Sequence, residues 1–333
     1  MAKYILKRIL WLIPVIIGVI SIIFFIMQLM PGDVISAILG NQSTEAAREA
    51  LRVELGLDQP VMVRWFNYVV GVFTRFDFGT SYISGQPIGR EIAAHLPVTI
   101  IMAVSASLFG AIVGMPLGVL SALKQYTWVD SLILVLTVFV VSMPSFWLAL
   151  MLIKVFAVNL QWLPAFGLKS LSGWVLPMFV NCLAPMGLIT RITRSSLLEV
   201  MREDYVRTAR AKGQVEKIII VRHMLRNALI PVVTSIGAGL AGALGGNMAI
   251  EIIFALPGLG NYVMTSISNR NYTAMLGGIL VTSIMFTVVN LIVDLIYVAI
   301  DPRLKTQMTG KKIGRRKSKQ MMKELEEESC QRI

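Results

Sequence analysis

Charged residues are scarce in this sequence: they make up 15% of its 333 residues, whereas an average soluble domain carries about a quarter. Hydrophobic residues, in contrast, make up 56%. Several apolar runs approach or exceed the roughly 20 residues that a helix needs to cross a bilayer. The short alternating segments typical of a membrane β-barrel are absent. The composition therefore predicts an all-α, polytopic membrane protein.

Cysteine and histidine are also scarce. The two cysteines, Cys182 in an apolar run and Cys330 near the C-terminus, offer no sensible bridge, and no metal-ligand spacing surrounds them. The two histidines, His95 and His223, are far apart and belong to no cluster of ligands. We therefore expect free thiols and no metal site.

Sequence patterns of catalysis are missing as well. There is no G-x-x-x-x-G-K-[ST] phosphate loop, and the Gly310-Lys311-Lys312 segment lacks the upstream glycine and strand of one. No paired catalytic carboxylates and no nucleophile–base pair are visible. We expect no enzymatic activity and no cofactor in this chain. The net charge of +12 does not indicate nucleic acid, because aromatic residues are not interleaved with the basic ones.

The apolar runs predict six membrane-spanning helices. Their approximate ranges are 9–30, 97–123, 131–158, 174–190, 225–249 and 276–299. The first is longer than the core of a cleavable signal peptide and ends at Pro31, which indicates a retained signal anchor. The third is interrupted by Pro144, which predicts a kink. In the second, Gly110, Gly114 and Gly118 are spaced to let a neighbouring helix approach closely.

The distribution of charge predicts how these spans are oriented. The segment from Arg191 to Arg226 holds nine cations and four acids, and the segment from Asp301 to the C-terminus holds ten and five. The segment 251–275 holds only Glu251 and Arg270. Because cytoplasmic loops carry an excess of Lys and Arg, both termini are expected in the cytoplasm. An anionic lipid surface is a further possible contact of the basic tail.

Two short helices are expected in the outer segment between the first two spans. Thr44 to Leu55 suits an amphipathic helix that stops at Gly56. Val61 to Phe73 suits an interfacial helix, because it is too short and too charged to cross a membrane.

The basic segment between the fourth and fifth spans has its own pattern. Leu197, Met201, Tyr205 and Ala209 recur every four residues and are predicted to share one helix face. Gly213 follows Lys212 as a stop signal, and a second helix is expected from Glu216 to Met224. By pattern alone, this segment is either a linker on the membrane surface or a helix that binds a partner.

The residues of this segment favour the second alternative. Tyr205 to Gly213 (YVRTARAKG) resembles the cytoplasmic coupling loop of permeases in ATP-binding-cassette importers, in the dipeptide/oligopeptide/nickel branch. The segments 30–33 (MPGD), 251–260 (EIIFALPGLG) and 294–303 (DLIYVAIDPR) are similar to the B-type subunit of that branch. The resemblance extends over residues 1 to about 305.

The resemblance implies a type I importer transmembrane domain whose coupling loop, about 197–224, enters a groove on a soluble ATPase. The implied coupling residues are Met201, Tyr205, Arg207, Thr208, Ala209, Ala211, Lys212 and Gly213. Small residues at Ala209 and Ala211 would allow close approach to the ATPase. The implied division is an N-terminal helix with an outer region (1–95), a transmembrane domain (96–301) and a charged tail (302–333).

The same resemblance implies the partners and the location. They are a homologous second permease, two cytoplasmic ATPase subunits that bind ATP and Mg²⁺, an extracytoplasmic binding protein, and the lipid of a bacterial or archaeal cytoplasmic membrane. Dipeptides or oligopeptides are the first expected cargo; glutathione, nickel or a metal chelate are alternatives.

Charged residues within the spans are few, and Asp294 is the candidate for a translocation path, with Asn290 and Ser283 near its face. The alternative for Asp294 is a structural pairing with a neighbouring helix. A secondary transporter driven by an ion gradient is the rival function, but the sequence shows no clear internal repeat of the kind common in that class.

Overall fold

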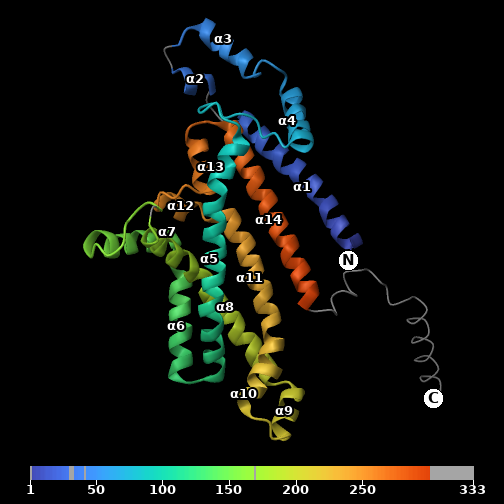
Figure 1. Ribbon diagram of the computed structural model, residues 1–333, viewed down its shortest axis with the longest axis vertical. Coiled ribbons are helices and arrows are strands. Elements are labelled where there is room, and N and C mark those ends of the chain that lie inside the picture. The colour runs from blue at the N-terminus through green and yellow to red at the C-terminus, as the bar shows by residue number, and fades with distance from the viewer. Residues whose placement is uncertain (1, 30–33, 41–42, 169, 301–333) are drawn as a thin grey trace, which may run out of the picture.

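The computed structural model describes residues 2–29, 34–40, 43–168 and 170–300 as an elongated assembly of helices (Figure 1). The α-helices are α1 (Ala2–Leu29), α2 (Val34–Leu39), α3 (Glu45–Glu54), α4 (Val61–Arg75), α5 (Ile88–Leu123), α6 (Trp128–Ser142), α7 (Ser145–Leu152), α8 (Ser172–Met201), α9 (Asp204–Ala211), α10 (Glu216–Ile218), α11 (Arg226–Gly246), α12 (Met248–Ile253), α13 (Leu259–Ser268) and α14 (Tyr272–Ile300). Two π-helical segments, η1 (Ile153–Asn159) and η2 (Ile219–Leu225), continue α7 and α10. The extended pairing in the described ranges is an isolated bridge between Thr80 and Pro87, so the all-α prediction is confirmed. The predicted tail, 302–333, lies outside the described residues.

Among the residues that the structure describes, five helical stretches are long and apolar enough to cross a membrane, namely Leu10–Leu29, Ile88–Leu123, Ser172–Met201, Glu216–Gly245 and Tyr272–Ile296. The sixth predicted span is a broken one. Its two parts, Trp128–Ser142 and Ser145–Asn159, meet at an angle of 97°. The break at Pro144 was predicted, but the expected kink is in fact a turn near a right angle. In Figure 1, α6 runs beside α5 while α7 points away from the bundle.

Two predicted helix boundaries were wrong. The second span was expected to begin at Pro97, but α5 begins at Ile88. The fourth was expected to end near Thr190, before the first cation, but α8 continues past Arg191 to Met201. Prolines inside the described helices are Pro14, Pro97, Pro116, Pro177, Pro185 and Pro231. A long helix in a packed bundle keeps its course past a proline because neighbouring groups satisfy the freed carbonyl. Proline is therefore a weak boundary signal in this chain.

The close approach predicted for the glycines of α5 is confirmed. A Cβ atom added at Gly114 would lie 2.7 Å from the Met186 carbonyl oxygen, and one at Gly118 would lie 2.6 Å from that of Thr190. Both carbonyls belong to α8. Since real Cβ atoms do not come so near to backbone, these glycines let α5 and α8 pack with their backbones nearly in contact.

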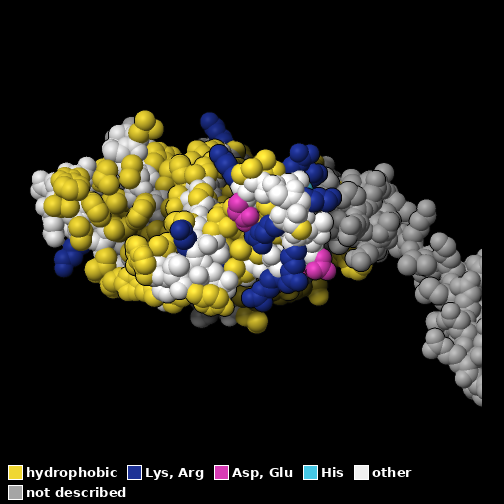
Figure 2. All heavy atoms as spheres, turned by 90° about the horizontal axis from the view of Figure 1, so that it is seen from below, with side chains coloured by type: hydrophobic (Ala, Val, Ile, Leu, Met, Phe, Trp, Pro, Cys, Tyr) yellow, Lys and Arg dark blue, Asp and Glu magenta, His cyan; other side chains and the backbone are white. Residues whose placement is uncertain are grey.

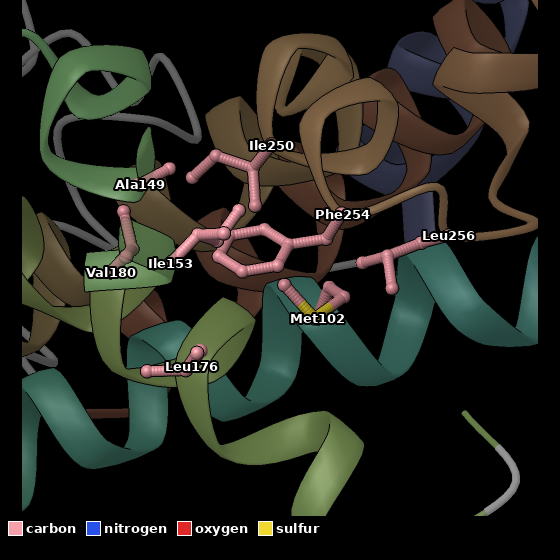
Figure 3. Packing of buried hydrophobic residues seen from close by; sticks show 8 residues of the cluster. All are labelled: Met102, Ala149, Ile153, Leu176, Val180, Ile250, Phe254 and Leu256. Atoms are coloured by element: carbon pink, nitrogen blue, oxygen red, sulfur yellow. The ribbon is translucent and has the colours of Figure 1, made fainter. Parts of the chain in front are cut away.

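A buried hydrophobic cluster joins the broken span to the rest of the bundle (Figure 3). It consists of Met102, Ala149, Ile153, Leu176, Val180, Ile250, Phe254 and Leu256. Phe254 lies at its centre, with its ring pointing toward Ile153 in the close-up. The cluster takes side chains from α5, α7, η1, α8 and α12, and so fixes α7 against the bundle despite the turn.

The outer region contains both predicted helices. α3 is capped by Thr44, whose hydroxyl accepts a hydrogen bond from the Ala47 N–H at 3.4 Å, and Gly56 has a left-handed φ of 64° just after the helix. α4 runs to Arg75, slightly beyond its predicted end. The Trp65 indole N–H of α4 donates to the Ser21 hydroxyl of α1 at 3.1 Å, which attaches this region to the first span.

Candidate coupling surface

The predicted coupling loop forms a compact helical hairpin at one end of the molecule, built by α9, α10 and η2 (Figure 1). α8 ends at Met201, and Glu203 takes an extended conformation that starts α9 in a new direction. Asp204 in the first turn and Arg210 in the last turn both suit the helix dipole. Gly213, with φ of 74°, then reverses the chain, as its sequence position predicted.

One face of α9 is buried against the chain itself. Val206 is fully buried and Ala209 is 6% exposed, and both pack in a cluster with Leu197, Ile219 and Met224. The cluster also contains Ala122 of α5 and Ala228 of α11. α9 is therefore seated on a base that reaches three of the long helices.

The opposite face of α9 is exposed. Tyr205, Arg207, Thr208, Ala211, Lys212 and Gly213 are all exposed to solvent. Ala209 and Ala211 were both expected to allow close approach to the ATPase. Ala209 instead faces inward, so only Ala211 is on the exposed surface. Met201 is half-buried at the end of α8.

The helix predicted from Leu197 through Ala209 is also corrected. The chain breaks at Arg202 and Glu203, so the first two residues of the four-residue pattern lie on α8 and the last two on α9. The periodicity continued across the break, and no proline or glycine marked it.

Polar contacts hold the hairpin closed. Arg210 and Glu216 form an ion pair at 2.7 Å, which raises the pKa of the guanidinium. The Asn227 amide donates to the Tyr205 phenol oxygen at 2.9 Å. His223 and Gln214 form a hydrogen bond of 2.9 Å across the turn. These contacts join α9 to the start of α11, so the hairpin is a single unit and not a loose linker.

This end of the molecule is basic. Figure 2, which views the structure from below, shows Lys and Arg side chains gathered on part of the face, beside hydrophobic side chains. The exposed cations of the hairpin and its flanks are Arg202, Arg207, Arg210, Lys212, Lys217, Arg222 and Arg226. The hairpin thus offers a projecting, positively charged helix on a packed base.

The residues predicted for a translocation path lie on a different element, α14. Ser283 donates to the Ile279 carbonyl oxygen and Asn290 to that of Phe286, so both bond back to their own helix. Asp294 is half-buried further along α14. α14 packs against α11, where Val293 fills the space left by Gly237.

Sequence reasoning missed a buried carboxylate, Glu251. Its two oxygens accept hydrogen bonds from the Thr99 hydroxyl at 2.7 Å and from the Asn261 N–H at 2.9 Å. The Thr99 oxygen in turn accepts the Leu259 N–H at 2.8 Å. Together these two side chains satisfy the start of α13, while burial raises the pKa of Glu251. A Cβ at Gly258 would lie 2.3 Å from the Glu251 carboxyl carbon. Glycine at this position therefore leaves room for the buried Glu251 carboxylate.

A second missed contact is a buried ion pair. Asp130, at the start of α6, receives two hydrogen bonds of 2.8 Å from the Arg194 guanidinium of α8. The Ser121 hydroxyl and the Tyr126 N–H also donate to this carboxylate. The sequence did not predict this pair, because Asp130 in the first turn of α6 gives no indication that its partner is Arg194, 64 residues later.

Comparison with known proteins decides the family. Residues 114–306 match the binding-protein-dependent transport system inner membrane component, and residues 1–103 match the N-terminal part of such membrane components. The chain belongs to this family. It is therefore a multi-pass permease component of an importer and not an enzyme, as the resemblance implied.

Relatives and a solved structure agree with this assignment. The chain is 40% identical to the dipeptide transport system permease protein DppB of Alkalihalophilus pseudofirmus, over 92% of this chain and 100% of the relative. It is 37% identical to the glutathione transport system permease protein GsiC of Escherichia coli K12, over 92% and 99%. The fold is similar to a chain of the inward-facing MetNI methionine ABC transporter, with a TM-score of 0.54, 20% identity, and coverage of 65% of this chain and 99% of that chain. The type I importer fold is thus confirmed.

Proposed function

We propose that this permease imports short peptides. The relative that is 40% identical over nearly the whole chain is named for dipeptides, and the 37% relative for glutathione, which is itself a small peptide. Dipeptides or oligopeptides are the first proposed cargo, and glutathione is the second. An extracytoplasmic binding protein delivers the cargo, and a homologous second permease completes the pore.

The observation that carries the mechanism is the exposed face of α9 on its buried base. We propose that Tyr205, Arg207, Thr208, Ala211 and Lys212 contact a groove on a cytoplasmic ATPase subunit. ATP and Mg²⁺ are held by two such subunits. When these close on ATP, α9 moves, and its base carries the motion into α5, α8 and α11. Ala209 and Met201 belong to that base.

The proposed orientation follows from the basic end of the molecule. With the α9 hairpin in the cytoplasm, the outer helices α3 and α4 lie on the opposite side, and both termini are cytoplasmic. The division into an outer-facing N-terminal part (1–95), a transmembrane domain (96–301) and a cytoplasmic tail (302–333) is part of this proposal. Ser283, Asn290 and Asp294 are proposed to border the path. Because the binding protein selects the cargo, a sparse path suffices.

The exposed small residues of α11 are proposed to face the second permease. A Cβ added at Gly239 or Gly242 would meet nothing within 4 Å, whereas one at Gly237 would meet Val293 at 2.4 Å. Small residues on a helix let the backbone of a partner helix approach in a membrane. Gly237 thus serves the chain's own packing, and the other two are free for a neighbour.

Reconstitution tests the proposal. The tagged chain is purified in mild detergent with its partners, placed in liposomes, and supplied with binding protein and a labelled dipeptide. We expect ATPase subunits to co-purify, and uptake to require both ATP and the binding protein. The chain alone should not hydrolyse ATP. Uptake that persists without ATPase subunits and follows an ion gradient would instead establish a secondary transporter.

A further inference from the structure

The end of α5 and the start of α6 lie toward the same end of the molecule as the α9 hairpin (Figure 1). There, Asp130 of α6 accepts two hydrogen bonds of 2.8 Å from the Arg194 guanidinium of α8. It accepts two more, from the Ser121 hydroxyl of α5 and from the Tyr126 N–H of the loop that joins α5 to α6. These four hydrogen bonds, which we call the Asp130 joint, tie α6 to both α5 and α8.

The Asp130 joint adjoins the base on which α9 is seated. Ser121 is fully buried and directly precedes Ala122, which packs in that base. Arg194 lies on α8 one helical turn before Leu197, which is another member of the base. The turns of α5 and α8 that support α9 therefore also carry two of the groups that hold Asp130.

α6 itself contributes no residue to the apolar base of α9 within the ranges that the structure describes. A further close contact between α6 and α8 lies deeper in the bundle, where a Cβ added at Gly187 would be 2.6 Å from a Val141 methyl carbon and 3.3 Å from the Thr137 carbonyl oxygen. Thr137 lies two helical turns, or about 10 Å, beyond Asp130. α6 is thus held to α8 at two levels, by the polar joint near the hairpin and by close packing further along.

The other end of α6 leads into the broken span. α7 leaves α6 at an angle of 97°, and Ala149 of α7 packs in the buried cluster of Figure 3. An α-helix of 15 residues is a stiff rod about 22 Å long, so a displacement of one end moves the other end as well. α6 therefore connects the region of the α9 base with α7.

We propose that the Asp130 joint transmits the motion of α9 to α6 and, through α6, to the broken span. Asp130 and Arg194 are then positioning residues of coupling. A bidentate pair of this kind fixes the orientation of the two helices as well as their distance, whereas apolar packing is non-directional. With the joint intact, α6 moves as one body with the base of α9. This inference rests on the proposed coupling role of α9 and not on the identity of the cargo.

Distances between spin labels test the inference in the complete transporter with its ATPase subunits. The labels are attached at Trp128→Cys on α6 and Lys217→Cys on α10, two exposed positions, in an otherwise cysteine-free complex held in lipid nanodiscs. Distances are measured without nucleotide and after trapping with ATP and vanadate. We expect the same distance distribution in both states, because the hairpin and the start of α6 move together.

The double variant Asp130→Ala/Arg194→Met removes the joint without leaving an unpaired buried charge, so the chain should remain folded. Its label distance should shift or broaden when nucleotide is trapped. The amount of peptide imported per ATP hydrolysed should fall several-fold, while ATPase subunits co-purify as before, because the exposed face of α9 is intact. Arg194→Lys keeps the charge but loses the two-pronged geometry, and its effects should lie between those of the unsubstituted chain and the double variant.

Lys124→Met is the matched control. It removes an exposed cation from the same loop, outside the four hydrogen bonds of the joint, and should change neither the distances nor the ratio of import to hydrolysis. An unchanged distance distribution in the double variant overturns the inference, and so does an unchanged ratio, an equal loss in Lys124→Met, or a nucleotide-dependent distance in the unsubstituted chain.

Failure of the proposed function gives a different result. If the unsubstituted transporter imports no peptide, the proposed cargo is wrong, and the distance distributions alone still decide whether α6 follows α9. If no ATPase subunit co-purifies with the unsubstituted chain, the coupling role of α9 fails and the inference fails with it.

Discussion

Gly213 combines two features that make it a sharp probe of coupling. Its φ of 74° lies in the left-handed region, and an added Cβ would meet nothing within 4 Å. A substitution there strains the backbone without a steric clash. Asparagine tolerates this conformation, whereas a β-branched residue does not.

Gly213→Val should therefore uncouple the transporter while Gly213→Asn stays close to the unsubstituted protein. Valine redirects the end of α9 to relieve a strain of about 1–2 kcal/mol. We expect the ratio of ATP hydrolysed to peptide imported to rise several-fold in the valine variant at equal expression. Normal transport by that variant would remove Gly213 from the proposed mechanism.

The buried ion pair of Asp130 and Arg194 joins α6 to α8 and is a second residue-scale test. The Asp130 side chain is 5% exposed and the Arg194 side chain 20% exposed, so removing one of them leaves the charge of the other largely shielded from water and without its partner. Removing one partner of a buried pair usually costs about 3–5 kcal/mol, whereas replacing both by apolar groups costs much less.

Asp130→Ala should lower the thermal midpoint of the purified permease markedly, and adding Arg194→Met should recover part of the loss. Unfolding followed by intrinsic fluorescence in detergent measures both. Two independent, additive losses would show that the pair does not act as a unit, since a coupled pair must depart from additivity.

At the scale of elements, glycines on two helices have opposite surroundings. Gly114 of α5 lies against the α8 backbone, and Gly242 of α11 lies in open space. We expect Gly114→Val to impair folding and membrane insertion of the chain alone. Gly242→Val should leave the isolated chain folded but reduce co-purification of the second permease. The two variants are matched in chemistry, so equal effects on folding would refute the assignment of the α11 face.

The start of α13 gives another element-scale prediction. Both oxygens of Glu251 accept hydrogen bonds, so an apolar side chain of similar length cannot replace it. Glu251→Met should leave the Asn261 N–H without its acceptor in a buried place and cost about 1–3 kcal/mol. Faster amide exchange at Asn261 and Leu259 in the variant is the expected measurement. A variant with unchanged exchange would show that Glu251 does not hold this helix end.

How far the sequence predicted these elements depends on the range of the interaction. The start of α3 next to Thr44, the stop at Gly56 and the turn at Gly213 are local, and all three were found where their residue types predict them. The glycine spacing of α5 also predicted its packing. The contacts of Glu251 with Thr99 and of Asp130 with Arg194 join distant parts of the chain. No local pattern encodes such a partner, so these contacts required the fold.

The whole molecule is asymmetric in charge, and this asymmetry is what determines its proposed orientation. Lys124 and Lys212 are exposed near the basic end, and Val53 on α3 is 58% exposed in the outer region. The composition predicted a polytopic helical protein, but the right-angle turn after α6 was not predictable, because proline alone sets no angle. Sidedness therefore needs a direct measurement.

Single cysteines at these positions provide that measurement, in a chain whose Cys182 and Cys330 are replaced by alanine. A membrane-impermeant maleimide should label Val53→Cys on intact spheroplasts, and should label Lys124→Cys only after permeabilisation, because the basic end faces the cytoplasm. Lys212→Cys should behave as Lys124→Cys does when the ATPase subunits are absent, and should be protected when they are bound. Lys124→Cys is the control for general access to that side. Labelling of Lys212→Cys from outside would place α9 across the membrane from any cytoplasmic ATPase, and a coupling role for that helix would then be physically impossible.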